Sequence, residues 1–230
     1  YIWPRFLQTA EETVGKVAEQ ASEQGTGFPE LTVTEEEVAD DFYCQQLTER
    51  ERMIYREILQ GVNGMEEMVK IHATAEDDVG KIYEYLLYDH PELFWCAGNT
   101  SLTIYDEYTE LTPGYTCSSQ EKEERQSRID AAAQECLSGI DSGASDYEKI
   151  KYVFEYIVNT VDYDENAPDN QNIYSSMVGK SSVCAGYSRM AQYLLTQMGI
   201  PCIYVIGEIE GQGSHAWNIV NCDGAYYQMD

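Results

Sequence analysis

The sequence has little positive charge. Of its 230 residues, 14 are Lys or Arg and 41 are Asp or Glu, which gives a formal net charge of −27 at pH 7. Proteins that bind nucleic acid or an anionic membrane surface need clustered basic side chains to neutralise phosphate groups. The composition therefore argues against both kinds of partner.

Long hydrophobic runs are also missing. No stretch approaches the roughly 18 consecutive apolar residues that suggest a membrane-spanning helix, so we expect no span. The chain begins with Tyr1 and has no recognisable signal peptide, and we interpret it as a processed product without its targeting segment. We expect an extracellular or cell-surface location.

The cysteines and histidines do not form a recognisable metal motif. The seven Cys and three His lack the spacing of zinc ligands. The acidic loop at 162–172 begins like a calcium loop, but Ala167 stands where such a loop needs Gly and Ile173 where it needs Glu. We therefore expect no metal and no other cofactor.

The residue patterns divide the chain into two regions. Residues 1–143 are acidic and mainly helical by pattern, with helices expected near 6–23, 34–60, 75–89 and 120–137 and a strand near 102–111. Residues 144–230 combine two helical patterns with strands near 202–209, 215–222 and 225–230. The sequence predicts an α+β protein, with a helix packed on an antiparallel sheet in the second region.

The second region contains clear local signals. Ser145 and Glu148 form a capping box that opens a helix. A second helix starts at or near Cys184 and ends before Gly199. Its apolar residues keep a helical period throughout: Tyr187, Met190, Ala191, Leu194, Leu195 and Met198.

The pair Asp223-Gly224 predicts a hairpin near the end of the sequence. Such a pair between alternating apolar runs favours a two-residue turn. That turn places Asp230 opposite Trp217, so His215 and Asp230 are diagonal neighbours on one face of the sheet. A carboxylate at this position can hold an imidazole in one tautomer.

Cys184 is the candidate nucleophile. At the start of a helix, free amides and the helix dipole favour a thiolate over a thiol. We expect this helix to lie across the sheet face that carries His215. Cys184, His215 and Asp230 would then converge as nucleophile, base and orienting carboxylate.

Five short motifs support the same interpretation: Val183-Cys184-x-Gly186-Tyr187, Gly199-Ile200-Pro201, Gly207, His215-Ala216-Trp217-Asn218 and Asp223-Gly224-x-Tyr226-Tyr227-x-x-Asp230. In order and spacing, this stretch of about 145–230 resembles the transglutaminase-like core of the papain-like superfamily. That superfamily includes transglutaminases, bacterial proteases and peptide N-glycanases. The resemblance implies that Cys184 is the nucleophile, His215 the general base and acid, and Asp230 the residue that orients His215. It also implies a helical extension ahead of the core, as in some bacterial members.

The expected reaction is acyl transfer at a carboxamide of a protein or peptide through a thioester on Cys184. Water would complete hydrolysis, which we favour, and an amine would complete a cross-link. The backbone N–H of Cys184 is one expected oxyanion donor. Candidates for a second donor or for the substrate groove are Tyr174, Ser181, Ser182 and Trp217. The alternative is a catalytically degenerate module that binds a partner at a surface or scaffold.

Two further cysteines are expected to lie close together. If residues 210–214 form the loop between the first two strands of the sheet, Cys202 lies opposite Cys222. Opposed strand residues can satisfy the distances of a disulfide, although not every pair geometry allows the bond. We predict their proximity and leave the bond open.

Overall fold

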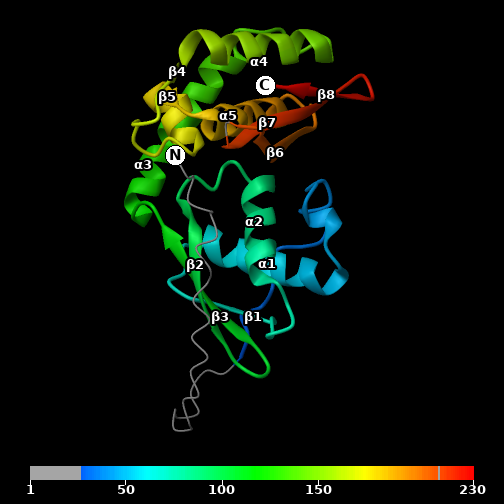
Figure 1. Cartoon of the computed structure of the whole chain (residues 1–230), viewed down its shortest axis with the longest axis vertical. Coiled ribbons are helices and arrows are strands. Elements are labelled where there is room, and N and C mark those ends of the chain that lie inside the picture. Colours follow the sequence, from blue (N-terminus) through cyan, green and yellow to red (C-terminus); the bar gives the residue numbers. More distant parts are fainter. Residues whose placement is uncertain (1–26, 212) are drawn as a thin grey trace. The chain divides into compact units, whose positions relative to one another are not determined.

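The computed structural model describes residues 27–211 and 213–230 (Figure 1), so the helix expected near 6–23 lies outside the described residues. By contacts, these residues form two compact units. The N-terminal unit comprises residues 27–89 and 95–116, and the C-terminal unit comprises residues 90–94 and 117–230. The boundary expected between residues 143 and 144 falls inside the C-terminal unit and, as a domain boundary, stays a prediction.

The N-terminal unit combines helices with a small sheet. Its helical elements are η1 (Cys44–Gln46), α1 (Glu49–Asn63) and α2 (Val79–Asp89). Strands β1 (Val69–Ile71), β2 (Cys96–Ile104) and β3 (Thr109–Tyr115) form an antiparallel sheet in the order β1-β3-β2. Apolar side chains from the helices and the sheet are fully buried, among them Ile54, Ile58, Ile71, Ile82, Leu86 and Leu111.

The prediction of a single helix over residues 34–60 is wrong. The side chains of Thr34 and Glu37 do exchange capping hydrogen bonds, but the chain after them forms turns and the short η1 instead of an α-helix. The helix begins at Glu49, behind a second capping box formed by Thr48 and Glu51. A new cap of this kind starts a helix and so separates it from whatever precedes it.

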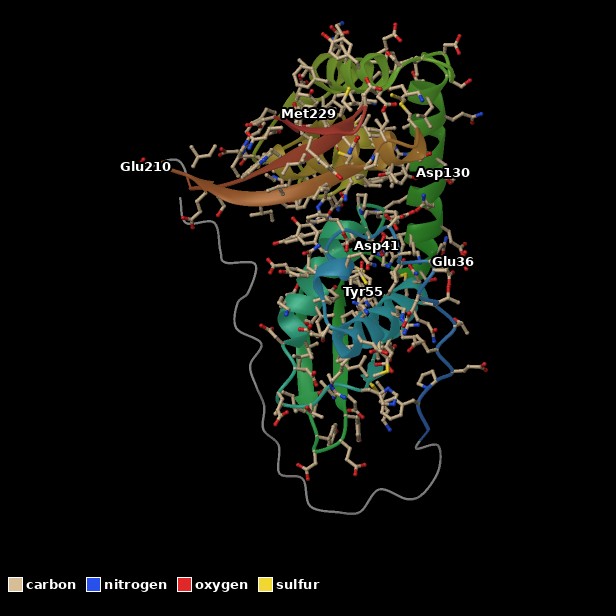
Figure 2. The ribbon with its side chains drawn as sticks, turned by 90° about the vertical axis from the view of Figure 1, so that its right-hand side faces the viewer. Glu36, Asp41, Tyr55, Asp130, Glu210 and Met229 are labelled. Carbon is tan, nitrogen blue, oxygen red and sulfur yellow. The ribbon has the colours of Figure 1, made fainter. Side chains whose placement is uncertain are left out.

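A partly buried carboxylate holds the segment around η1 in place. Asp89, at the end of α2, accepts hydrogen bonds from the backbone N–H groups of Tyr43 and Cys44, both at 2.9 Å. The hydroxyl of Tyr55 on α1 lies 3.1 Å from Asp89 and 3.2 Å from Asp41. Figure 2 labels Tyr55 and Asp41. This cluster joins η1, α1 and α2.

The strand expected at 102–111 is a hairpin. Strands β2 and β3 pair from Leu102↔Leu111 to Ile104↔Thr109, and the Tyr105 N–H donates to the Tyr108 carbonyl at 2.8 Å across the turn. The alternating pattern continues through the turn, so the pattern alone does not reveal it. The region ahead of α3 therefore contains a three-stranded sheet in addition to its helices.

The C-terminal unit confirms the expected α+β architecture. Its helices are α3 (Ser119–Leu137), α4 (Asp146–Thr160), the short η2 (Ser175–Gly179) and α5 (Cys184–Gln197). Strands β6 (Cys202–Ile209), β7 (Gly213–Cys222) and β8 (Ala225–Met229) form an antiparallel sheet in that order, and α5 packs on β6 and β7 (Figure 1). The two-residue strands β4 (Asp162–Tyr163) and β5 (Ser181–Ser182) pair in parallel.

The predicted register of the β7–β8 hairpin is confirmed, and the predicted register of the β6–β7 hairpin is wrong. Strands β7 and β8 pair Cys222 with Ala225, as the Asp223-Gly224 turn predicts. Strands β6 and β7 extend to Ile209↔Gly213, so their connection is two residues shorter than expected, and Cys202 lies opposite Val220 rather than Cys222. All seven cysteines are free thiols, and the expected extracellular or cell-surface location stays a prediction.

Candidate active site

Cys184 is the first residue of α5, as expected. The N-cap residue, Val183, is extended and makes no side-chain cap, so the first amides of α5 remain available to a negative charge. The helix starts against the preceding turn, because a Cβ at Gly186 would lie 1.9 Å from Ser182 Oγ. Glycine at this position therefore lets the turn that leads to Cys184 close onto β5.

His215 and Asp230 make the predicted diagonal contact. His215 Nε2 lies 2.8 Å from Asp230 Oδ1, and the two side chains are 24% and 63% exposed. Because Nε2 is hydrogen-bonded to Asp230, Nδ1 is the ring nitrogen that can exchange a proton with another group. The Trp217 ring lies beside the imidazole at a centroid distance of 6.0 Å, and it covers Gly207, where a Cβ would lie 2.4 Å from the indole.

Helix α5 packs on the other face of the sheet from the one we expected. The buried residues Ala216, Asn218 and Val220 face α5, and Asn218 Nδ2 donates to the Ser188 carbonyl at 3.0 Å. His215 and Trp217 alternate with them and lie on the opposite face. The apolar stripe of the helix is buried by Ala216 and Val220, which leaves the polar imidazole on the more open face.

Cys184 nevertheless lies at about the level of His215 along the sheet. Strand β7 runs in the same direction as α5. The chain reverses direction between α5 and β6, and β7 is antiparallel to β6. Cys184 precedes Ser188 by about 6 Å of helix, and Ala216 precedes Asn218 by about 6.6 Å of strand. The Ser188–Asn218 contact therefore places Cys184 near Ala216. Among the described residues, no hydrogen bond or ion pair joins Cys184 to His215.

Tyr163 is a site residue that the sequence analysis missed. It pairs with Ser182 across β4 and β5, and its ring contacts that of Tyr187 at a centroid distance of 6.1 Å. Burial and then the charges of Cys184 and Glu165 raise the pKa of Tyr163, whereas the backbone N–H of Cys184 lowers it. Tyr163 thus lies close to Cys184, and it is 62% exposed. A two-residue strand is too short for any periodic signal.

The side chains of Tyr174 and Ser182 are hydrogen-bonded elsewhere, whereas the indole Nε1 of Trp217 is buried and has no hydrogen-bond partner among the described residues. The hydroxyl of Tyr174 accepts a hydrogen bond from Arg128 Nη1 at 2.5 Å. The Ser182 hydroxyl donates to the Asn170 carbonyl at 2.7 Å, and the Ser181 carbonyl accepts from the Ser175 hydroxyl. The oxyanion or groove roles of Tyr174, Ser181, Ser182 and Trp217 stay predictions.

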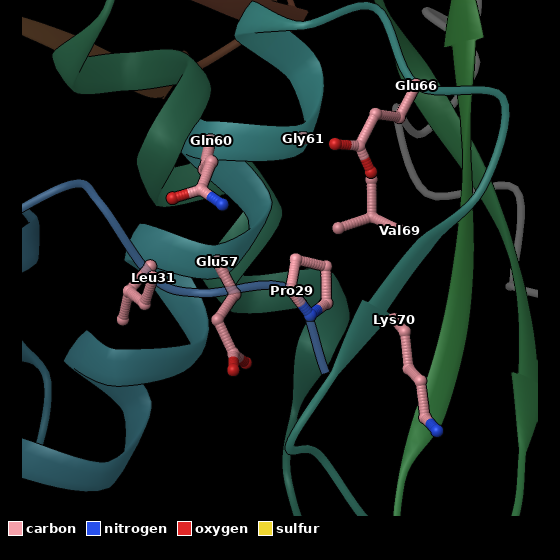
Figure 3. A pocket seen from close by; sticks show the side chains of 8 residues that line it. All are labelled: Pro29, Leu31, Glu57, Gln60, Gly61, Glu66, Val69 and Lys70. Carbon is pink, nitrogen blue, oxygen red and sulfur yellow. The ribbon is translucent and has the colours of Figure 1, made fainter. Parts of the chain in front are cut away.

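A small cavity lies in the N-terminal unit (Figure 3). Its volume of about 10 Å³ is at the lower limit for one water molecule. It lies beside Gly61, where a Cβ would be 2.3 Å from Val69, and we interpret it as a packing gap between α1 and β1. Its lining is Pro29, Leu31, Glu57, Gln60, Gly61, Glu66, Val69 and Lys70.

The described part of the chain contains no cluster of three or more His, Cys, Asp or Glu side chains placed to hold a metal ion. In the same part, no helix is both long enough and apolar enough to cross a membrane.

The family match to this chain lies within the C-terminal unit. A family model described as the transglutaminase-like superfamily matches residues 130–230. Among solved structures, a TGase aligns with a TM-score of 0.42 and 16% identity, covering 71% of this chain and 50% of its own. The chain thus spans half the length of that protein.

Two bacterial structures are also similar. A proposed cysteine protease from Cytophaga hutchinsonii aligns with a TM-score of 0.38 and 13% identity, covering 57% of this chain and 61% of its own. A proposed protease from Parabacteroides distasonis has a TM-score of 0.34 and 9% identity, covering 57% and 35%. A search of curated protein sequences finds no match.

Proposed function

We propose that this chain, whose residues 130–230 belong to the transglutaminase-like superfamily, is a cysteine-dependent enzyme that transfers acyl groups from carboxamides of proteins or peptides. The observation that carries the proposal is the 2.8 Å contact between His215 Nε2 and Asp230 Oδ1, beside a helix that begins with Cys184. A nucleophile, a base and a group that orients the base are the parts that such a reaction needs.

In the first step, His215 Nδ1 takes the proton of the Cys184 thiol. The sulfur attacks the carboxamide carbon, and the electron pair of the C=O bond moves to oxygen. This step requires the thiol and the imidazole to come within hydrogen-bond reach, a contact that is often long in substrate-free enzymes.

The resulting oxyanion needs at least two hydrogen-bond donors. We assign one to the backbone N–H of Cys184 and the other to the phenol of Tyr163, which lies close to Cys184. The substrate oxygen then accepts a hydrogen bond from the Cys184 N–H, and the Tyr163 hydroxyl rotates to donate a second hydrogen bond to the oxyanion without transferring its proton.

In the second step, the imidazolium gives its proton to the leaving amine, the C–N bond breaks, and a thioester forms on Cys184. Water, activated by His215, then attacks the thioester and releases a carboxylic acid. An amine in place of water would form a new amide. We propose water as the main acceptor.

A second function is favoured by a different observation. No hydrogen bond or ion pair joins Cys184 to His215 in the described residues, and Asp230 is largely exposed. A module that binds a partner and has lost catalysis would show the same fold.

The test uses p-nitrophenyl acetate, which transfers its acetyl group to an activated thiol. We expect release of p-nitrophenol and one acetyl group mapped to Cys184 by mass spectrometry. The Cys184→Ala variant should lose both signals, whereas Cys222→Ala, which removes another partly exposed thiol, should keep them. An acetylation rate at Cys184 equal to that of Cys222 would favour the binding module.

A second assay separates hydrolysis from cross-linking. A glutamine-containing peptide is incubated with the enzyme and a labelled amine, and both products are quantified. Release of free acid in excess of labelled amide supports hydrolysis. The reverse ratio would overturn the choice of water as acceptor.

A further inference from the structure

Two arginines on α3 face the segment at 169–174. Arg125 Nη1 lies 2.9 Å from Asp169 Oδ2, with side chains 21% and 31% exposed. Arg128, nearly one turn later, donates to the Tyr174 hydroxyl at 2.5 Å. Both guanidinium groups also lie over the Tyr174 ring, at 4.8 and 5.4 Å from its centroid. Few cations exist in this chain, and two of them hold one short segment.

The same segment touches the turn that leads into Cys184. The carbonyl of Asn170 accepts the Ser182 hydroxyl at 2.7 Å and the Val183 N–H at 3.3 Å. A Cβ on Gly186 would lie 3.2 Å from this carbonyl. The position of Asn170 therefore sets the path of the chain as it enters α5.

The backbone at Asp169 needs support to hold this carbonyl in place. Asp169 has a φ of +53°, a left-handed conformation that Asp tolerates better than most residues but that still carries a cost. The ion pair with Arg125 acts on this residue, directly before Asn170. Tyr174, at the other end of the segment, is stacked on Phe94 at 6.4 Å as well as bonded to Arg128.

An exposed ion pair of this kind would contribute little. The Arg125–Asp169 pair differs because both side chains are mostly covered and because a single bonded path runs from Asp169 through Asn170 to Val183. A shift of the segment is transmitted to the nucleophile. Displacements of about 1 Å at a reacting group can reduce a rate by roughly 10²-fold.

We infer that Arg125 and Arg128 are positioning residues of the proposed active site. They act through the 169–174 segment on the turn before Cys184. Both lie ahead of residue 130, where the match to the transglutaminase-like superfamily begins, so α3 contributes to the site from outside the matched region. The inference rests on the proposed function for its catalytic part only.

The test compares Arg125→Gln with Arg125→Lys and with Lys151→Gln. Lys151 pairs with Glu155 on α4 at 2.5 Å, with both side chains about half exposed, and so provides a matched ion pair away from the segment. For Arg125→Gln we expect roughly tenfold slower acetylation of Cys184 by p-nitrophenyl acetate at an unchanged KM. Arg125→Lys should recover most of the rate, and Lys151→Gln should match the unaltered chain.

Two further measurements do not depend on catalysis. In Arg125→Gln, amide hydrogen exchange should accelerate in the peptide covering 181–187, and the rate of Cys184 alkylation by iodoacetamide should change. Neither should change in Lys151→Gln, and thermal melting should show that both variants are folded.

The outcomes separate the two proposals. If the unaltered chain is not acetylated at Cys184 but exchange and alkylation respond to Arg125→Gln, the proposed function fails and the positioning role stands. If acetylation is normal and neither exchange nor rates respond, the positioning role is overturned. An equal response to Lys151→Gln would also overturn it.

Discussion

Each unit of the molecule contains a histidine bonded to a carboxylate 15 residues away in the sequence, and these two pairs differ in their surroundings. The third described pair, His90–Glu92, joins near neighbours in the chain. In the N-terminal unit, Glu57 is 10% exposed and holds both the His72 ring and the His72 backbone N–H. The ring is also stacked on Phe28 at 3.4 Å. In the C-terminal unit, Asp230 is 63% exposed and contacts His215 through one oxygen.

The difference shows that a histidine–carboxylate contact does not by itself indicate catalysis. Glu57 uses both oxygens to fasten the end of β1 to α1, which is a structural task. His215 keeps a ring nitrogen free on the strand that packs against a helix beginning with Cys184. What distinguishes the His215–Asp230 pair from the His72–Glu57 pair is the position of the Cys184 thiol.

The largest expected effect comes from removing each imidazole. His215→Ala should lower the rate of Cys184 acetylation by roughly 10³-fold, because the proposed general base and acid is lost. His72→Ala should leave the rate unchanged and lower only the stability. The measurement is the acetylation rate of the two variants beside their melting curves. An equal loss of rate in both would remove the distinction between the pairs.

The next effect concerns Tyr163. Tyr163→Phe should slow acetylation by roughly 10²-fold, since one oxyanion donor is lost. Alkylation by iodoacetamide creates no oxyanion and should keep its rate. Tyr226→Phe, at an exposed tyrosine on β8, is the control. A parallel decrease in both reactions would assign Tyr163 to packing instead.

The partly buried carboxylate of Asp89 in the N-terminal unit predicts a dependence of stability on pH. Burial raises the pKa of Asp89 from its ordinary 3.8 to about 6, against the opposing effect of the N–H groups of Tyr43 and Cys44; Asp41 also raises it and the Tyr55 hydroxyl lowers it. The folded state therefore favours the protonated form. This stabilisation is complete below pH 3.8 and is lost as the pH rises through about 6.

Asp89→Asn removes this titration. Between pH 4.5 and 7.5, the free energy of unfolding of the unaltered chain should fall by about 2 kcal/mol more than that of the variant. Urea titrations at the two pH values measure the difference. Asp230→Asn, at an exposed carboxylate, should behave like the unaltered chain. Identical pH profiles for Asp89→Asn and the unaltered chain would contradict the assignment.

The smallest effect is expected for Asp230 itself. Asp230→Asn should slow acetylation by roughly tenfold, because an exposed carboxylate is screened by water and orients the ring less strictly than a buried one. Glu57→Gln should leave the rate unchanged and lower the melting temperature. A rate loss in Asp230→Asn as large as that in His215→Ala would show that the orientation of the ring limits the reaction.

Local signals predicted the parts of the site that depend on neighbours in the chain. The Asp223-Gly224 turn allows one register, so the contact of His215 with Asp230 follows from counting residues. The first hairpin of the sheet has a longer connection whose length the residues do not reveal, and a change of two residues moved Cys222 away from Cys202. The continuous helix expected at 34–60 failed because Asp89, distant in sequence, binds the amides of Tyr43 and Cys44.

The amino-acid order by itself determined that Cys184 opens a helix and that His215 and Asp230 share a sheet face, because caps, helical stripes and two-residue turns act over a few residues. Tertiary structure alone decided which face of β7 meets α5 and that Tyr163 reaches Cys184. It also decided that Arg125 holds Asp169. These contacts join segments whose pairing depends on burial and on competition among many partners, which no short pattern in the chain encodes.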